Sequence, residues 1–357
     1  MHFVIFGLTI SSSWGNGHAT LWRGLCGALA RLGHRVTFFE RNVPYYEAHR
    51  DLTEFPGGEL RLYGNWESIR ADAERLLTGA DVAMVTSYCP DGLAATDLVL
   101  ASRARKIFYD LDTPVTLDHL ERGVPLTYIG PSGLAGFDLV LSFTGGRSLT
   151  ALQQRLGARR VAPLYGSVDP AAHRPVAPEE QYRCDLSYIG TYAEDRQEGL
   201  RKLFLAPAQA RPERRFLIAG AQYPAQFPWL ENLFFVRHIA PPDHAALYSS
   251  SRLTLNLTRR AMARSGYCPS GRLFEAAACA TPVLSDSWEG LEQFFEPGRE
   301  ILVARKTEEV LAALALPDGV LRKLGARARE RALAEHSASR RAAELEGLLN
   351  DSVVQRD

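Results

Sequence analysis

The sequence predicts an α/β protein made of two doubly wound, Rossmann-like domains. A chain of 357 residues, 46% of them hydrophobic, is long enough for two domains with a core each. Near the N-terminus an apolar strand ends in a glycine and is followed by a helix and a second strand, and the same succession starts again near residue 185. Strands that alternate with helices are typical of parallel sheets covered by helices.

The first domain begins with a βαβ unit. The apolar run His2–Gly7 is predicted to be a strand, and the leucines that follow it lie on one face of a helix predicted for residues 19–32. Gly33 suits the C-terminal cap of this helix, and residues 35–40 are predicted to form the next, parallel strand. Further strands are predicted at 82–86, 106–109 and 138–143, with helices at 66–77 and 94–101.

A proline-bearing stretch at residues 163–178 interrupts this pattern and indicates the domain boundary. We predict a first domain over residues 1–168, a second over residues 169–335, and a C-terminal helix over residues 336–357 that packs back on the body. In the second domain, strands are predicted at 185–190, 215–220, 253–257 and 282–285, with helices at 197–205 and 271–279. The charged stretch 321–349 has leucines on one stripe and is predicted to be an amphipathic helix.

Composition narrows the classes of function. Lys+Arg and Asp+Glu both total 41, so the net charge gives no reason to expect nucleic acid or an anionic membrane as the main partner. The five cysteines form no CxxC pair, and their odd number favours reduced thiols. No run approaches the ~20 apolar residues that span a bilayer, and the apolar start lacks the basic residues of a signal peptide. We therefore expect a cytoplasmic protein without a transmembrane segment.

The clearest indication of a ligand site is a polar, glycine-containing loop that opens a helix in the second domain. At Ser270 and Gly271 the free N–H groups and the positive end of the helix dipole can receive a phosphate. Arg272 adds positive charge there, and Arg264 is a second candidate. Glu275 lies one turn inside the helix, a depth at which a carboxylate can accept hydrogen bonds from two ribose hydroxyls. The alternative is a capped helix with a glutamate on its surface.

Residues 275–286, EAAACATPVLSD, resemble the donor-site helix and strand of group 1 glycosyltransferases. In that family the glutamate binds the nucleotide ribose, so the resemblance implies this role for Glu275. The family usually has another glutamate eight positions earlier, where this chain has Tyr267, and this departure leaves the grip on the sugar ring undefined.

An ordered set of motifs over nearly the whole chain is similar to the CgeB-like branch of these enzymes. The motifs are SSSWGNGH (11–18), VPYY (43–46), YDLDTPV (109–115), PLYGSVD (163–169), SYIGTY (187–192) and WEGL (288–291). The resemblance implies the GT-B fold, in which two Rossmann-like domains face a central cleft and the second domain holds the donor.

The first glycine loop does not match the dinucleotide fingerprint GxGxxG, which disfavours a dehydrogenase. Gly17 lets the backbone approach a ligand, and His18 follows it at the predicted start of a helix. The helix dipole favours the neutral imidazole that a general base for an acceptor hydroxyl requires. Several inverting GT-B enzymes similarly carry a histidine after the first strand. The alternative is that His18 caps the helix or positions the acceptor without proton transfer.

Asp110 and Asp112 follow a predicted strand and are expected to point into the same cleft. Their Asp-Leu-Asp spacing imitates the metal-binding DxD motif of the other glycosyltransferase architecture, GT-A. Because two repeated α/β halves favour GT-B, where the helix dipole and basic side chains usually replace the metal, we expect no metal here. We expect acceptor binding or orientation of His18 instead, and the alternative is a purely structural turn.

Other donor-binding candidates lie after strands of the second domain. Gly190 and Thr191 end its first strand, and Arg196 follows at a distance that suits a pyrophosphate contact, although a solvated surface arginine is the alternative. His238 and Ile239 occupy the place where related enzymes touch the base, and His238 could equally be a surface histidine.

These features together predict a metal-independent glycosyltransferase without a cofactor. Its donor is expected to be a UDP-, GDP- or dTDP-linked sugar, and the acceptor is unidentified. His18 favours inversion at the anomeric carbon, whereas the resemblance around Glu275 favours retention, which we prefer. One rival is a nucleotide-sugar 2-epimerase of the same architecture, which needs acid-base carboxylates around the sugar. The other is a two-lobed ligand-binding protein, and the missing export signal argues against it.

Overall fold

The computed structural model describes residues 1–55 and 57–351 and divides the chain into two compact units. The first unit comprises Met1–Tyr165 together with the segment from Ala338 onward, and the second comprises Gly166–Ser337. The chain therefore changes unit after residue 165, where residue 168 was predicted. The C-terminal helix starts at residue 338, where 336 was predicted, and belongs to the first unit.

The first unit is built on a seven-stranded parallel sheet, as its strand–helix alternation predicts. The strand order is β3-β2-β1-β4-β5-β6-β7. The bounds are β1 His2–Gly7, β2 Arg35–Arg41, β3 Gly58–Tyr63, β4 Val82–Thr86, β5 Arg105–Asp110, β6 Leu139–Ser142 and β7 Val161–Pro163. Sequence patterns missed the two edge strands, β3 and β7, because β3 is mostly half-buried and β7 has three residues.

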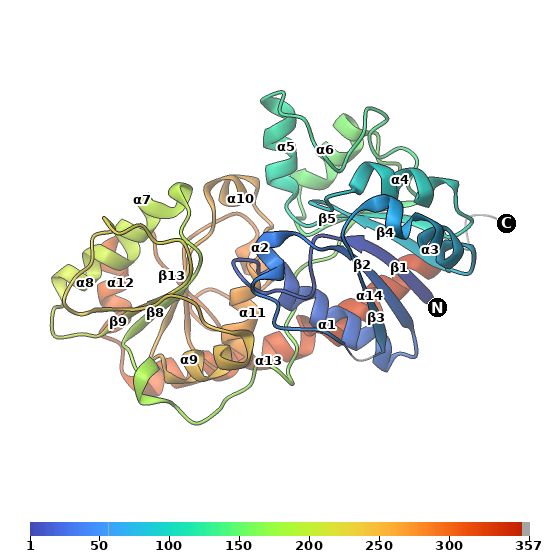
Figure 1. Cartoon of the computed structure of the whole chain (residues 1–357). Coiled ribbons are helices and arrows are strands. Elements are labelled where there is room, and N and C mark those ends of the chain that lie inside the picture. Colours follow the sequence, from blue (N-terminus) through green and yellow to red (C-terminus); the bar gives the residue numbers. More distant parts are fainter. Residues whose placement is uncertain (56, 352–357) are drawn as a thin grey trace. The chain divides into compact units, whose positions relative to one another are not determined.

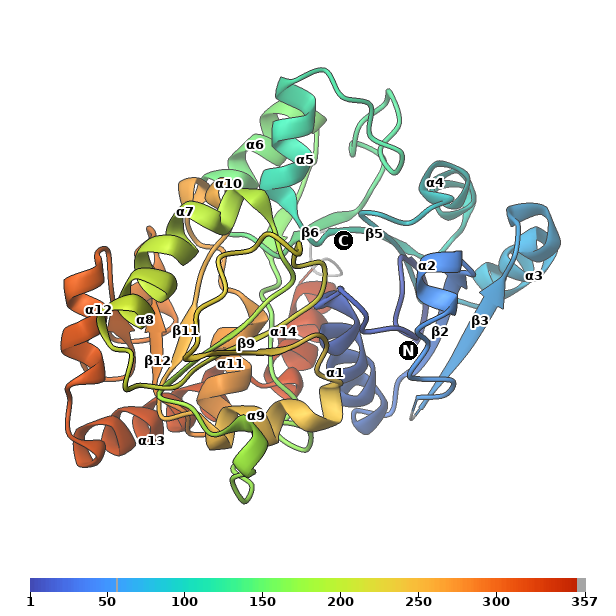
Figure 2. The same ribbon diagram turned by 60° about the vertical axis from the view of Figure 1, so that its left-hand side comes forward.

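Helices cover both faces of this sheet, and each face has its own core. The helices are α1 His18–Arg31, α2 Pro44–Glu47, α3 Trp66–Thr78, α4 Gly92–Ala101, α5 Thr113–Glu121, α6 Arg147–Leu156 and α14 Ala338–Asn350. On one face α1 and α14 lie side by side, as Figures 1 and 2 show. Trp22 of α1 is 1% exposed and packs edge-on against Phe38 and Tyr109.

The second unit contains a six-stranded parallel sheet in the order β10-β9-β8-β11-β12-β13. The strands are β8 Leu186–Ile189, β9 Phe216–Ala219, β10 Leu233–Val236, β11 Thr254–Asn256, β12 Val283–Ser285 and β13 Leu302–Val303. The helices are α7 Gln197–Leu200, α8 Ala206–Ala210, α9 His244–Ser250, α10 Arg260–Ser265, α11 Gly271–Ala278, α12 Thr307–Leu314 and α13 Asp318–Glu335. Short 3-10 turns lie at Glu180–Tyr182, Glu194–Arg196, Pro241–Asp243 and Leu291–Gln293.

Two helices differ from the prediction for physical reasons. Between α7 and α8 the helix widens into a π-turn at Arg201–Leu205, because Pro207 has no N–H to donate within the helix. The single helix predicted over 321–349 is wrong, since it breaks between α13 and α14. At the break the His336 ring packs 4.6 Å from the Phe274 ring, and its carbonyl accepts a hydrogen bond from the Val168 N–H.

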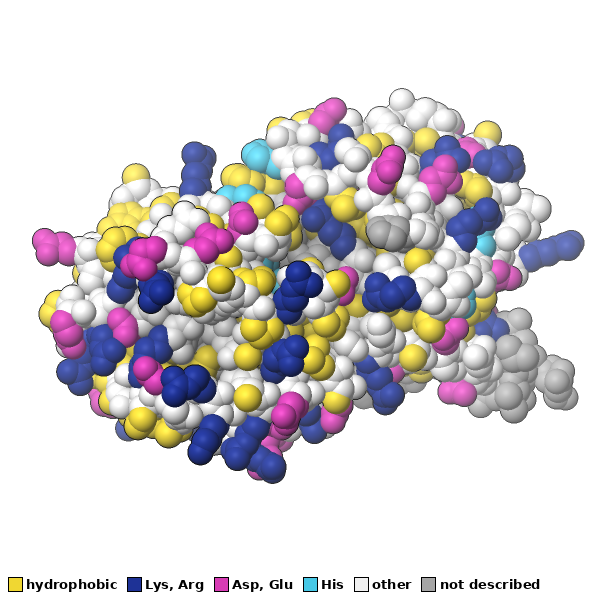
Figure 3. All heavy atoms as spheres, turned by 90° about the horizontal axis from the view of Figure 1, so that it is seen from below, with side chains coloured by type: hydrophobic (Ala, Val, Ile, Leu, Met, Phe, Trp, Pro, Cys, Tyr) yellow, Lys and Arg dark blue, Asp and Glu magenta, His cyan; other side chains and the backbone are white. Residues whose placement is uncertain are grey.

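The structure also bears on three expectations from composition, namely membrane-spanning segments, the state of the cysteines and the distribution of charge. Among the described residues no helix combines the length and apolar character needed to cross a membrane. All five cysteines are buried and have free thiols, as their spacing suggests. On the face in Figure 3, basic and acidic side chains lie interspersed, in keeping with their equal totals.

Candidate functional site

In both units the candidate residues gather where the strand order reverses. In the first unit this point lies between β1 and β4, and in the second it lies between β8 and β11. In open α/β sheets, ligands bind beyond the carboxyl ends of the strands at such a switch point. The structure therefore offers one candidate site in each unit.

Arg272 connects the two strand ends at the switch point of the second unit. It is the second residue of α11, and its backbone N–H and Nε donate to the N-cap Ser270 hydroxyl at 3.3 and 3.0 Å. Its terminal nitrogens donate to the carbonyl oxygen of Ile189, at the end of β8, at 2.8 Å and to that of Leu257, after β11, at 3.3 Å. These contacts use three of the five guanidinium N–H groups. Arg272 thus fixes the N-terminus of α11 as well as supplying charge.

Arg196 brings a second guanidinium group to the same strand end. One of its terminal nitrogens donates to the hydroxyl of Tyr188 at 3.1 Å. Burial opposes ionisation of Tyr188, but the guanidinium groups of Arg196 and Arg272 outweigh it and lower the pKa of the phenol. This lowered pKa indicates a concentration of positive charge, which suits an anionic ligand.

Two glycines let the backbone segments pass closely at this strand end. A Cβ at Gly190 would lie 2.6 Å from the Tyr188 hydroxyl and 3.1 Å from Arg196. A Cβ at Gly220, after β9, would lie 2.0 Å from the Gly190 carbonyl oxygen and 3.2 Å from the Thr191 nitrogen. The predicted pair Gly190 and Thr191 is therefore held against β9.

Glu275 lies in the first turns of α11 with its carboxylate turned back toward Gly271. A Cβ at Gly271 would lie 3.7 Å from Oε1 of Glu275. The Tyr248 hydroxyl donates to Oε2 at 3.4 Å, and Nδ1 of His244 lies 3.9 Å from the same oxygen. The Glu275 side chain is 11% exposed, so the alternative of a surface glutamate is wrong. Sequence reasoning missed His244 and Tyr248, since nothing in their local pattern distinguishes them from ordinary helix residues.

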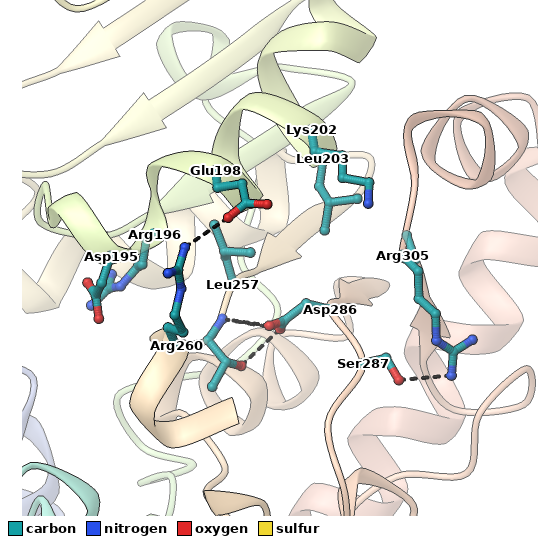
Figure 4. A pocket seen from close by; sticks show the side chains of 13 residues that line it. Asp195, Arg196, Glu198, Lys202, Leu203, Leu257, Arg260, Asp286, Ser287 and Arg305 are labelled. Carbon is teal, nitrogen blue, oxygen red and sulfur yellow. Dashed lines mark hydrogen bonds and ion pairs between the residues drawn. The ribbon is translucent and has the colours of Figure 1, made fainter. Parts of the chain in front are cut away.

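A cavity of about 350 Å³ opens beside Arg196 and Leu257, as Figure 4 shows. Charged side chains of both signs line it, namely Arg196, Lys202, Arg260, Arg305, Asp195, Glu198 and Asp286. Asp286 follows β12 and accepts hydrogen bonds from the backbone N–H and hydroxyl of Thr258 at 3.1 and 2.9 Å. Burial raises the pKa of Asp286, although the Thr258 bonds oppose the shift. Sequence analysis included Asp286 only as the last residue of the segment 275–286, and these bonds show that it joins the ends of β11 and β12.

Three predicted residues are placed less directly. Arg264 is exposed on α10 and, within the described chain, makes no hydrogen bond or ion pair with α11, so its role stays a prediction. His238 is half-buried, whereas Ile239 is 5% exposed and its backbone hydrogen-bonds with His244 beside Glu275.

Tyr267, where a second glutamate was expected, has a positive φ of 48° and donates its N–H to the Glu289 carbonyl oxygen at 2.7 Å.

In the first unit the structure brings His18 and Asp112 together. His18 is the first residue of α1, and Gly17 is the N-cap without a side chain to cap the helix. Nε2 of His18 lies 3.8 Å from Oδ2 of Asp112, and their side chains are 22% and 15% exposed. Tyr88, which follows β4 with a φ of 63°, stacks near His18 at 6.4 Å between ring centroids. Sequence analysis missed Tyr88, because a strained φ has no sequence signature outside glycine.

Asp110 and Asp112 differ in burial, and whether both face a ligand stays a prediction. The Asp110 side chain is fully buried, and burial raises its pKa to about 6. Oδ1 accepts hydrogen bonds from the Thr116 hydroxyl at 3.1 Å and from the Asp112 N–H at 3.2 Å. Asp110 therefore supports the loop that presents Asp112, and Asp112 is the exposed member of the pair.

Comparisons with known proteins agree with this fold. Residues 196–347 match the family model described as glycosyl transferase-like. Among solved structures, sucrose-phosphate synthase from Thermosynechococcus elongatus is similar with a TM-score of 0.70 at 16% identity, covering 99% of this chain and 100% of that one. Anabaena HepE, solved in complex with UDP-glucose, has a TM-score of 0.67 at 13% identity, covering 98% and 100%.

A protein described as a UDP-N-acetylglucosamine 2-epimerase, from Listeria monocytogenes, has a lower TM-score of 0.55 at 12% identity, covering 100% of this chain and 97% of that one. No curated protein matches the sequence significantly. At identities this low, the structural similarity establishes the fold alone. This fold is of the GT-B type, as predicted. The chain is therefore a two-unit protein of the GT-B fold whose residues 196–347 are similar to the glycosyl transferase-like family.

Proposed function

We propose that the protein is a glycosyltransferase that moves a sugar from a nucleotide-sugar donor to an acceptor. The observation that carries this proposal is the N-terminus of α11, where Arg272 and Glu275 lie within one turn at the switch point of the second sheet. The positive end of the helix dipole and a guanidinium suit a diphosphate, and the carboxylate suits a ribose diol. This segment also lies inside the family match.

The same arrangement supports transfer without a metal. The leaving diphosphate gains negative charge as the glycosidic bond breaks, and fixed positive groups lower the cost of that charge. Arg196 donates to the Tyr188 hydroxyl and Arg272 lies over the Tyr188 ring, and together with the α11 dipole they supply these groups. We propose retention of the anomeric configuration, with the donor phosphate accepting the proton of the acceptor hydroxyl on the face from which the nucleotide leaves. NMR of the first-formed product tests this configuration.

In the first unit, we assign His18 and Asp112 to the acceptor. At 3.8 Å the Asp112 carboxylate lies close enough to the imidazole to orient it. Such a pair suits a hydroxyl-rich acceptor through hydrogen bonds. The N-cap Gly17 has no side chain to cap α1, and the backbone N–H of His18 donates to Oδ1 of Asn16 at 3.0 Å.

The proposal is tested by a thermal-shift panel of UDP-, GDP- and dTDP-sugars. A ligand at 100 times its Kd stabilises the native state by about 2.7 kcal/mol, enough to raise the melting temperature measurably. UDP-glucose is the first probe, because HepE was solved with it. Glu275→Gln should weaken donor binding, whereas Glu292→Gln, an exposed glutamate of the same unit, should not. Equal donor affinity in both variants would refute the donor-site assignment.

The epimerase alternative has a separate test. Incubation with UDP-N-acetylglucosamine and no acceptor converts the donor in an epimerase but not in a transferase. Release of UDP only when an acceptor is present supports transfer, and accumulation of the 2-epimer without acceptor supports the alternative.

A further inference from the structure

Three side chains converge beside the proposed ribose carboxylate. His173 lies near the start of the second unit, His244 is the first residue of α9, and Glu275 lies on α11. One imidazole nitrogen of each histidine and one carboxylate oxygen all lie within 4.8 Å of one another. Chain segments separated by about 30 to 70 residues thus bring two imidazoles and a carboxylate to one point, although neither histidine belongs to a recognised motif.

Ring nitrogens of both histidines lack the hydrogen bonds that enclosed imidazoles normally make. His173 is 1% exposed, and neither of its ring nitrogens has a hydrogen-bond partner among the described residues. Nδ1 of His244 also lacks one. Because a neutral imidazole always carries one N–H donor and one acceptor, burying these groups unpaired costs stability. Such orphaned nitrogens indicate a ligand that completes their contacts.

The charge state of the cluster suits a cation. A neutral imidazole offers a lone pair to a metal. Glu275 forms no ion pair with a lysine or arginine of the described chain, so its charge is available to a cation.

We infer that His173, His244 and Glu275 form a binding site for a divalent transition-metal ion, with Zn²⁺ as the ion whose chemistry fits best. Two imidazoles and one carboxylate are a common zinc ligand set with a fourth position left open. Tetrahedral zinc at about 2.0–2.1 Å from its ligands separates them by about 3.4 Å. The present spacing, at most 4.8 Å, reaches this value through small side-chain rotations. The side chains of His244 and Glu275, 14% and 11% exposed, give the ion its entry.

This site has a functional consequence that rests on the proposed function. If Glu275 binds the donor ribose, it cannot also hold the metal, and the ion and the nucleotide sugar exclude each other. The metal is therefore an inhibitor at the donor site and no part of the transfer reaction. Raising Zn²⁺ should increase the apparent Kd of the donor without changing the amount bound at saturation.

Metal binding is tested on the full chain without any donor. After treatment with EDTA and buffer exchange, the protein is titrated with Zn²⁺ in competition with a chromophoric chelator. We expect one Zn²⁺ site per chain. Its affinity for Zn²⁺ should fall at least tenfold in His173→Gln and in His244→Gln. His119→Gln, a histidine of the first unit that is absent from this cluster, is the matched control and should bind as the wild type does. Circular dichroism melting checks that each variant is folded.

A second measurement avoids variants altogether. Co²⁺ added to the wild-type protein should give the visible absorption of a four-coordinate site, and Zn²⁺ should remove it. Absence of that spectrum together with equal Zn²⁺ affinity in all three histidine variants would overturn the metal site. If Zn²⁺ does not bind but His173→Gln weakens UDP-glucose binding, the cluster positions the nucleotide and the metal assignment is wrong. If Zn²⁺ binds and UDP-glucose does not compete with it, the metal site stands and the ribose role of Glu275 fails.

Discussion

Replacement of Asp110 by asparagine should change how the stability of the first unit depends on pH. Burial of this carboxyl raises its pKa from 3.8 to about 6. Below pH 3.8 it is protonated in the folded and in the unfolded chain. Between pH 3.8 and 6 the folded chain keeps a proton that the unfolded chain has released, so stability falls as pH rises. Above pH 6 the carboxyl is ionised in both states, and the loss of stability no longer changes with pH.

The size of this effect follows from the shift. Each pKa unit corresponds to about 1.36 kcal/mol, so a shift of about two units costs the folded state about 3 kcal/mol above pH 6. The amide of Asp110→Asn stays neutral and can still accept the hydrogen bonds of Thr116 and the Asp112 N–H. The stability of the variant relative to the wild type should therefore rise by about 2.4 kcal/mol between pH 4 and pH 7, because about 0.5 kcal/mol of the loss already occurs below pH 4.

The measurement is urea unfolding at pH 4, 5, 6 and 7, followed by hydrogen exchange and mass spectrometry of peptides from β5. Peptides are needed because a chain of two units need not unfold in one step. Asp97→Asn, at an exposed position of α4, is the control and should show no such change. A constant difference between Asp110→Asn and wild type across this pH range would refute the reasoning.

Three further predictions concern other parts of the molecule. Gly325→Ala places a Cβ 2.1 Å from the Ala280 carbonyl oxygen, so it should lower the free energy of unfolding in urea by about 1–3 kcal/mol. Gly319 lies on the same helix with open space around it, and Gly319→Ala should raise the free energy of unfolding by up to about 1 kcal/mol. Arg272→Lys removes the fork that joins β8 and β11 and should cost roughly 1–3 kcal/mol as well as weakening UDP-glucose binding by calorimetry; unchanged values would show that Arg272 is dispensable. His18→Asn should lower turnover by roughly 10²-fold or more while leaving donor affinity within twofold, and an equal loss in both would make His18 a binding residue.

The sequence predicts the parallel sheets because their central strands are continuous apolar runs between amphipathic helices. It fails at the edges, where β3 alternates irregularly and β7 has three residues, and at the break between α13 and α14. There the leucine stripe continues through the break, but its first half packs in the second unit and its second half in the first. Hydrophobic periodicity predicts which face of a helix is buried, but it does not predict which of the two units that face packs against.

In the candidate site, too, residues of a local pattern were predicted and residues brought together by the fold were not. A glycine-containing loop that opens a helix is a local pattern, so Ser270, Gly271, Arg272 and Glu275 are recognisable from their neighbours along the chain. His173, His244 and Tyr248 reach Glu275 from other segments, and only the folded sheet brings them there. The full burial of Asp110 was not predicted for a related reason, because strand position gives the direction of a loop and not the burial of each side chain in it.

The return of α14 to the first unit also constrains how the protein is made. Leu345 and Leu349 are fully buried in the same core as residues of β1 and α1, more than 300 positions earlier in the chain. During synthesis on the ribosome, this face of the N-terminal sheet therefore stays uncovered until α14 has been translated. The second unit, whose segments are contiguous, has no such delay. The half of the molecule that is translated first is thus the half that completes its folding last.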